Sequence, residues 1–295
     1  MFKYLKLRDK PDKVPTLSGN LTAEWLDKDS DIPVTLKQIN NLPVNIKRRV
    51  FRNLLSPRLL SRFGIHPITW KGSDNQERVG LTAEPGTHVV HLWAQASNDA
   101  ADEFFRLEMA DNPFDGIDLH LLLLNDPNSP RFETGHDEDG KPTLFGTARR
   151  NISEEKRAKE AGLAPAQIRS SLGASKLVFD QIDVFLATLG HQAYFFEPLT
   201  YASAWVFERR GSAYVRGHQL MDEIHREFLP GGELHAMLDA STPFRQPDQW
   251  RTIRGRAWAI HDGILEAIDA RWDNIRMIKQ VGRHAGVETF PEAIY

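Results

Sequence analysis

Residues 86–126 decide the fold, and they read GTHVVHLWAQA at 86–96, DEFFRLEMADN at 102–112 and DGIDLHLLLLND at 115–126. Each piece is rich in the β-branched, aromatic and aliphatic residues that favour strands. Turn-forming residues fill the gaps, namely Asn98 with Asp99, Asn112 with Pro113, and Asp115 with Gly116. Because these gaps are short, they predict an antiparallel meander. Residues 119–124 are almost continuously apolar, so we expect the third strand to lie in the middle of a sheet covered on both faces.

Beyond this meander, helical and strand patterns alternate along the chain. The expected elements are a helix from Ser153, a helix from about 171 to 189 ended by Gly190, a strand in AYFFEPL at 193–199 and a helix in TYASAWVFERR at 200–210 that stops at Gly211. SAYVRGHQL at 212–220 favours either a returning strand or the start of another helix. This alternation predicts an α+β protein with a mixed, largely antiparallel sheet flanked by helices.

The chain divides into three expected parts: an N-terminal arm with helices at 1–85, an α/β core at 86–221 and a C-terminal extension at 222–295. Residues 41–63 have helical spacing of apolar residues and are divided into two short helices by Pro57. This is also the most basic stretch. It favours an amphipathic helix with a solvated basic face, and a helix facing phosphate or a membrane is the alternative.

Composition narrows the class of protein. The 295 residues include no cysteine, which excludes disulfides, a cysteine nucleophile and thiolate metal sites, and which fits a cytoplasmic protein. The formal net charge of −3 lacks the strong basic bias of nucleic-acid binders. We find neither a signal peptide nor an apolar run long enough to cross a bilayer, so no membrane partner is expected.

Two segments carry a family resemblance by their order and spacing. Ser170-Ser171-Leu172-Gly173-Ala174-Ser175 precedes a long helix, and the later helix of 200–210 ends in Glu-Arg-Arg before Gly211. Together with the meander, they resemble the GNAT acyltransferase superfamily over roughly 88–221. That family cradles the pyrophosphate of acyl-coenzyme A on a loop of the form Gln/Arg-x-x-Gly-x-Gly/Ala. Here the first and last positions are both serine, which departs from the family pattern.

The resemblance implies acyl-coenzyme A as a co-substrate, with no metal. The loop from Ser170 to Ser175 would bind its pyrophosphate through backbone N–H groups at a helix N-terminus. Gly173 lacks a Cβ and would let the backbone approach, and Arg169 would add a charged contact. The resemblance also implies that strands near 117–125 and 192–198 are neighbours, parallel and splayed apart.

The resemblance leaves a gap in the chemistry. Many members place a tyrosine four residues before the terminal glycine of the late helix, where this chain has Phe207. Tyr201 and Tyr214 are the candidate proton donors in its place, and Glu197 is the candidate general base. The structural alternative is that both hydroxyls are hydrogen-bonded in the core and that Glu197 caps the following helix.

Acyl transfer to a small-molecule acceptor is therefore the leading hypothesis for function, and a homodimer is left open. The substitutions in the loop and at Phe207 favour a second hypothesis, a non-catalytic module that binds a ligand or partner. A third is a metal-dependent enzyme, because His218, Asp222 and His225 would share one face of a helix and could bind zinc or iron. A strand at His218 would exclude that helix.

His261 is followed by Asp262, but adjacency in sequence does not make a catalytic dyad.

The polar N-terminal residues, punctuated by Pro11 and Pro15, have little to bury. Removing residues 1–30 should therefore lower thermal stability or oligomer content modestly without abolishing folding, as measured by melting and size-exclusion chromatography. Complete loss of soluble protein would contradict this prediction.

Overall fold

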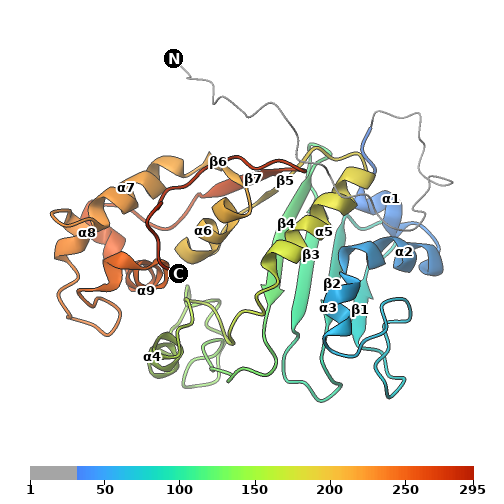
Figure 1. Ribbon diagram of the computed structural model, residues 1–295, viewed down its shortest axis with the longest axis horizontal. Helices are drawn as coiled ribbons and strands as arrows, with labels where there is room; N and C mark the ends of the chain where they lie inside the picture. The colour runs from blue at the N-terminus through green and yellow to red at the C-terminus, as the bar shows by residue number, and fades with distance from the viewer. Residues whose placement is uncertain (1–31) are drawn as a thin grey trace.

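The computed structural model describes residues 32–295, so the expected arm at 1–30 and its truncation lie outside the described part. The fold is α+β, as the sequence predicts. Seven strands form one mostly antiparallel sheet in the order β1-β2-β3-β4-β5-β7-β6 (Figure 1). Within 32–295, no helix is both long and apolar enough to cross a membrane.

The expected meander is confirmed, and one strand precedes it. β2 (Val89–Ala94), β3 (Phe105–Asp111) and β4 (Ile117–Leu124) pair antiparallel in sequence order. β1 (Val79–Thr82), which was not expected from the sequence, pairs with β2 at the edge of the sheet. β4 is the central strand of the seven. Burial on both faces of this strand was predicted wrongly for its second half, because Leu121–Leu124 are only half-buried.

β4 and β5 (Ala193–Phe196) are parallel neighbours, as the resemblance implied for strands near 117–125 and 192–198. Their pairing covers only Ile117–Leu119 against Tyr194–Phe196. Beyond Leu119, β4 continues for five residues that pair with no strand other than β3. One edge of β4 is therefore open in its second half, and the sheet divides there.

Two local features end the pairing of β4 with β5. In the β3–β4 register, Glu108 faces Leu121 and Met109 faces Leu119, which leaves His120 as an extra residue in a β-bulge. A bulge bends its strand and increases the local twist. On the other strand, Pro198 follows shortly after Phe196 and has no N–H to extend a ladder. The two strands therefore diverge at Leu119 and Phe196.

The sheet is completed by residues expected to form a C-terminal extension. β7 (Arg276–Gln280) lies between β5 and β6 (Ala213–Arg216) and is antiparallel to both. Residues 222–295 therefore contribute a strand to the core as well as helices. The expected alternatives at 212–220 both occur, because β6 ends at Arg216, left-handed Gly217 follows, and α7 (His218–Phe228) begins at His218.

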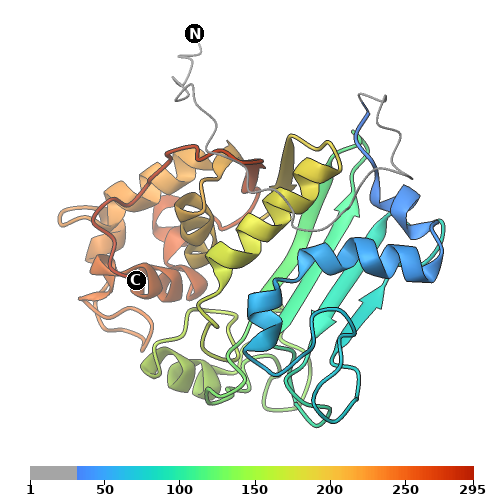
Figure 2. The ribbon, with the colours of Figure 1, turned by 45° about the vertical axis from the view of Figure 1, so that its right-hand side comes forward.

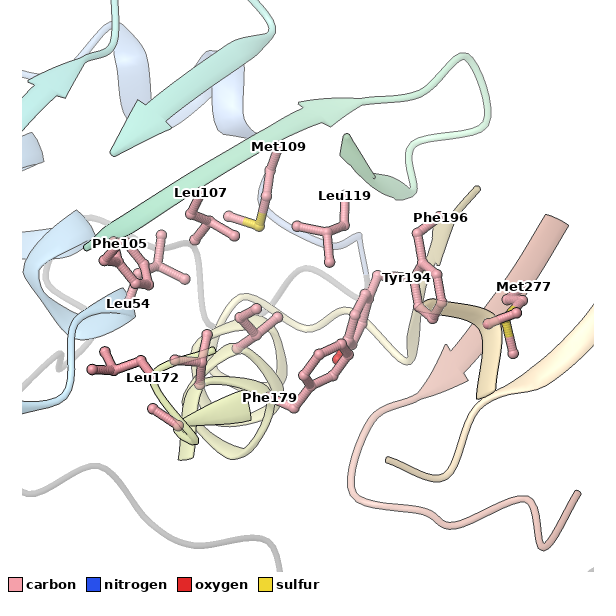
Figure 3. Packing of buried hydrophobic residues seen from close by; sticks show 14 of the residues in the cluster. Leu54, Phe105, Leu107, Met109, Leu119, Leu172, Phe179, Tyr194, Phe196 and Met277 are labelled. Atoms are coloured by element: carbon pink, nitrogen blue, oxygen red, sulfur yellow. The ribbon is translucent and has the colours of Figure 1, made fainter. Parts of the chain in front are cut away.

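Helices cover one face of the sheet near β1–β5. They are α1 (Leu36–Asn40), α2 (Val44–Phe51), η1 (Arg52–Leu54), α3 (Pro57–Ser61) and α5 (Ser175–Thr188). Figure 2 shows α2, α3 and α5 lying across the front of the strands. In Figure 3, Leu107, Met109 and Leu119 point from the strands toward α5, where Phe179 meets the rings of Tyr194 and Phe196. This layer is the main hydrophobic core.

The remaining helices belong to two long insertions and to the segments next to them. The segment from β4 to α5 contains α4 (Ile152–Glu160), and the segment from β6 to β7 contains α7, α8 (Glu233–Ala236), η2 (Gln249–Arg251), α9 (Ile253–His261) and η3 (Ile264–Ile268). α6 (Tyr201–Arg209) follows β5 and packs against α9. In Figure 1, α7–α9 gather beside α6, and α4 lies below them.

A buried carboxylate joins the helix layer to the sheet. Asp183 of α5 accepts hydrogen bonds from the Tyr194 hydroxyl and from the Lys279 ammonium, each at 3.1 Å. The backbone N–H of Gly282 also donates to it. Burial, followed by the charge of Asp183, raises the pKa of Tyr194 well above its ordinary value, so the phenol stays protonated. One side chain thus connects α5, β5 and β7.

Replacing Asp183 with alanine should lower the free energy of unfolding by about 3–5 kcal/mol, because it leaves the Lys279 ammonium buried without its counter-charge. Asp180→Ala is the matched control on the same helix. Its carboxylate pairs with Lys176 in an exposed i, i+4 ion pair, so the loss should stay below about 1 kcal/mol. Urea denaturation measures both, and equal losses would contradict the assignment.

Candidate functional site

Two adjoining cavities open where β4 and β5 diverge. The branch cavity, of about 680 Å³, is lined by residues 118–120, 145–147, 165, 196–201, 257, 260, 261 and 272–276. The strand cavity, of about 450 Å³, is lined by residues 119–125, 134, 135, 142, 144, 145, 165–168, 196, 197, 199, 200, 203 and 207. They share Leu119 and Phe196, the last paired residues of the two strands. Ligand sites favour such concave, mixed surfaces.

The strand cavity runs along the open edge of β4. Its wall includes Leu121–Leu124, which are half-buried because no strand pairs with that edge. Phe207 of α6 forms part of the opposite wall and packs against Phe196, with ring centroids 4.4 Å apart. An extended ligand in this cavity would meet apolar side chains together with the unpaired backbone groups of a strand edge.

The loop expected to bind pyrophosphate lies next to the end of β4. Ser171 bridges Asn125, and the backbone N–H of Leu172 donates to the carbonyl of Leu124 at 3.1 Å. α5 begins at Ser175 with no side-chain cap, so the N–H groups of its first turn lack helical partners. Residues 170–175 line neither cavity.

Gly173 has open space around it. Its φ is +70°, and a Cβ added there would meet no atom within 4 Å. Gly173 precedes α5, and no neighbour lies where its Cβ would be, so it is not a helical glycine required by close packing. The glycine provides a left-handed turn with an accessible backbone.

Arg169 points its guanidinium away from that loop. Its Nε donates to Asp102 at 2.8 Å, and its Nη1 contacts the carbonyls of Pro127 and Ser129. The side chain therefore joins the β4–α5 insertion to the β2–β3 connection.

Glu197 and Tyr201 line the same branch cavity, as does Thr200 between their elements. The Glu197 carboxylate is 64% exposed and pairs with Arg276 at 3.3 Å, which also pairs with Asp118 at 2.9 Å. Glu197 does not cap α6, as one alternative expected, because the Thr200 hydroxyl accepts from the Ser203 N–H and takes that place.

Tyr201 is buried, and its hydroxyl makes no hydrogen bond within residues 32–295. Burial raises the pKa of Tyr201 to about 12, although the positive charge of nearby Arg256 opposes the rise. Arg256 is itself fully buried: its Nε donates to the Trp250 carbonyl, and its guanidinium lies 3.5 Å from the ring centroid of Phe290. Tyr201 therefore lines the branch cavity as a neutral phenol, and its hydroxyl is buried near Arg256.

Tyr214 has a different environment. Its hydroxyl donates to Glu208 at 2.5 Å, and the same buried carboxylate accepts from the N–H and the hydroxyl of Thr289. Burial, followed by the charge of Glu208, raises the pKa of Tyr214 far above its ordinary value. Tyr214 lines neither cavity, although its phenol lies close enough to that of Tyr201 for the two to interact electrostatically.

His261 is a site residue that the sequence did not identify. It ends α9 and lines the branch cavity, and its Nε2 lies 3.3 Å from Oε1 of Glu155 on α4. Burial alone would raise the pKa of Glu155, but hydrogen bonds from His261 and Arg150 outweigh it and hold the carboxyl ionised. Asp262 instead pairs with Arg150 and Arg245. The only signal of this cluster in the sequence was the adjacency of His261 and Asp262. Glu155 is distant in sequence and gave no such signal.

The residues of the metal hypothesis do form the expected helical face on α7. His218 lies 3.8 Å from Asp222, but the Nδ1 of His225 faces Arg256 at 3.2 Å. Burial and the Arg256 charge lower the pKa of His225. Across residues 32–295, no three His, Asp or Glu side chains converge in a group able to hold a metal ion.

The two tyrosines should respond differently to loss of the hydroxyl. Tyr214→Phe leaves Glu208 with one fewer donor and should lower the free energy of unfolding by about 1–3 kcal/mol. Tyr201→Phe removes a hydroxyl without a partner, so stability should stay within about 0.5 kcal/mol or rise. Urea denaturation of the pair measures this, and the reverse order would contradict the hydrogen bonding described.

Comparison of the chain with protein-family models, with curated proteins and with solved structures finds no match. Function must therefore be inferred from the geometry of the site itself.

Proposed function

We propose that this chain is a GNAT-like acyltransferase that moves an acyl group from acyl-coenzyme A to a small-molecule acceptor. The observation that carries the proposal is the divergence of β4 and β5 after three paired residues, with cavities opening at that point. The open strand edge, the apolar wall and the uncapped helix lie in an order that suits the parts of acyl-coenzyme A.

The pantetheine arm of coenzyme A is an extended chain with two amide groups. Such a chain would pair with the free edge of β4 beside Leu121–Leu124, as an added strand does. Its thioester would then reach Leu119 and Phe196, where the strand cavity meets the branch cavity.

The pyrophosphate would lie at the other end of the strand edge, near the start of α5. Leu124 and Leu172 are joined by a backbone hydrogen bond, so the end of β4 and the loop are adjacent. Unpaired N–H groups and the positive end of the α5 dipole favour an anion there. Gly173 would keep the approach open.

At the thioester, the acceptor would attack the carbonyl while backbone donors on β4 stabilise the developing oxyanion. A phenol whose pKa is about 12 is too weak an acid to protonate a thiolate fully, since thiols ordinarily have a pKa near 8.5. The Tyr201 hydroxyl, which lines this region from α6, would instead donate a hydrogen bond to the departing sulfur after a small shift of the buried side chain. Glu197, at the opening of the branch cavity, remains a candidate base.

A non-catalytic binding module is the second candidate. It is favoured by Phe207, which has no proton to give, and by Tyr214, whose proton is held by Glu208. Coenzyme A would then bind without release of thiol from acetyl-coenzyme A in the presence of any acceptor.

Isothermal titration calorimetry with coenzyme A and acetyl-coenzyme A should detect binding to the wild-type protein. Gly173→Val should weaken it at least about tenfold, because a branched side chain would occupy the approach to the loop. Gly140→Val is the matched control: it has a similar φ of +75° and open surroundings, but lies in a turn outside both cavities.

Both valine variants should lose similar stability from backbone strain, and only Gly173→Val should lose affinity. No heat from the wild-type protein at millimolar coenzyme A would count decisively against acyl transfer.

A further inference from the structure

His261 has the surroundings of a side chain that is held for a chemical role. It comes from the β6–β7 insertion, and its partner Glu155 comes from the β4–α5 insertion, 106 positions earlier in the chain. The Glu155 side chain is 3% exposed and that of His261 is 14% exposed. His261 lines the branch cavity together with residues at the end of β5, and Glu155 contacts it from outside that lining.

The ring of His261 is fixed from two sides. A Cβ at Gly146 would lie 2.2 Å from Cε1 of the imidazole, so the backbone of residue 146 lies directly against the ring. Trp258 meets the ring edge to face, with centroids 5.7 Å apart. Gly146 also has φ of +83°, which a residue with a side chain rarely adopts. The orientation of the imidazole is therefore set by packing as well as by Glu155.

The neighbouring charges leave Glu155 as the carboxylate that acts on His261. Arg150 donates to both Glu155 and Asp262, and Arg245 donates to Asp262 at 3.0 Å. Asp262 is thereby occupied by two guanidinium groups. With Nε2–H directed at Glu155, Nδ1 carries the lone pair, and no side chain or backbone group in residues 32–295 donates to it. This arrangement resembles the orienting acid and base of hydrolytic triads in its physics.

We infer that His261 is the general base that takes the proton from an acceptor amine in the branch cavity, and that Glu155 is its positioning residue. This inference rests on the proposed acyl transfer. The amine nitrogen forms a bond to the thioester carbonyl, the C–S bond breaks, and the electron pair leaves on sulfur. His261 removes the proton of the attacking amine and returns it to the thiolate, which departs as coenzyme A thiol.

Other titratable groups of the same cavity are less suited to that step. Asp118 and Arg276 pair with each other, and Arg276 also engages Glu197. Tyr201 is protonated over the whole working range, since its pKa is about 12. His120 and Asp273 also line the cavity, and His120 is exposed, whereas His261 is held by Gly146 and Glu155. The acceptor would thus be deprotonated from the side of α9.

The test follows thiol release from acetyl-coenzyme A with water, ethanolamine or tyramine as acceptor, across pH 5 to 8, where imidazoles change charge. The wild-type rate should rise with pH. His261→Gln should lower kcat/KM about a hundredfold or more. It should also abolish the rise of the rate with pH, which is called the limb below. Its affinity for coenzyme A should stay within about threefold. Glu155→Gln should lower kcat more than it changes KM, because the imidazole loses the carboxylate that orients it.

His136→Gln is the matched control, since His136 pairs with Glu133 at 2.9 Å in the same insertion, yet is exposed and lines neither cavity. It should leave rate and pH profile unchanged. His261→Asn, with thermal melting of every variant, separates loss of the base from loss of the fold. Glu197→Gln tests the competing base.

Persistence of the limb in both His261 variants, its loss in Glu197→Gln alone, or no thiol release by wild-type protein that binds coenzyme A would each overturn the assignment of His261. Failure of the wild-type protein to bind coenzyme A would instead remove the proposed function, and the role of His261 with it.

Discussion

The limited pairing of β4 with β5 is the constraint on which the site depends. Three residues of each strand are joined in parallel, after which the bulge at His120 turns β4 and Pro198 ends the ladder of β5. A continuous pair would fill the space with backbone hydrogen bonds and leave no cavity. Because the strands diverge inside a sheet rather than at its edge, the unpaired backbone of β4 faces a wall of side chains and remains available to a ligand.

The two long insertions supply the residues of the site that do not come from the sheet. The β4–α5 insertion supplies Glu155 and the turn at Gly146, and the β6–β7 insertion supplies His261. They meet over the point of divergence, where their contact includes a cluster of charged groups linked by Arg150. Buried ion pairs contribute little net stability by themselves, but they hold a defined geometry because a broken pair is costly. That property suits a region that must place a histidine accurately.

Buried charge also organises the framework around the site. Asp183 connects α5 to β5 and β7, while Glu208 connects α6 to Tyr214 and Thr289. Within residues 32–295, no salt bridge joins Arg256 to a carboxylate. The Trp250 carbonyl and aromatic rings hold its guanidinium, and desolvation by burial lowers its pKa. These groups fix α5, α6 and α9, the three helices that border the parted strands. The buried charged groups that stabilise the framework therefore also hold the helices around the site.

The sequence by itself determined the local elements, because strands, helix ends and turns follow from neighbouring residues. The meander of 86–126 and the glycines after two helices, Gly190 and Gly211, correspond to the structure. The parallel pairing near 117–125 and 192–198 was expected from the family resemblance and not from local pattern. β1 and the place of β7 were missed, because pairing partners are set by contacts between distant segments. Only the tertiary structure brought His261 to Glu155 and left Tyr214 outside the cavity that Tyr201 lines. A dyad is a relation in space, and no spacing along the chain encodes it.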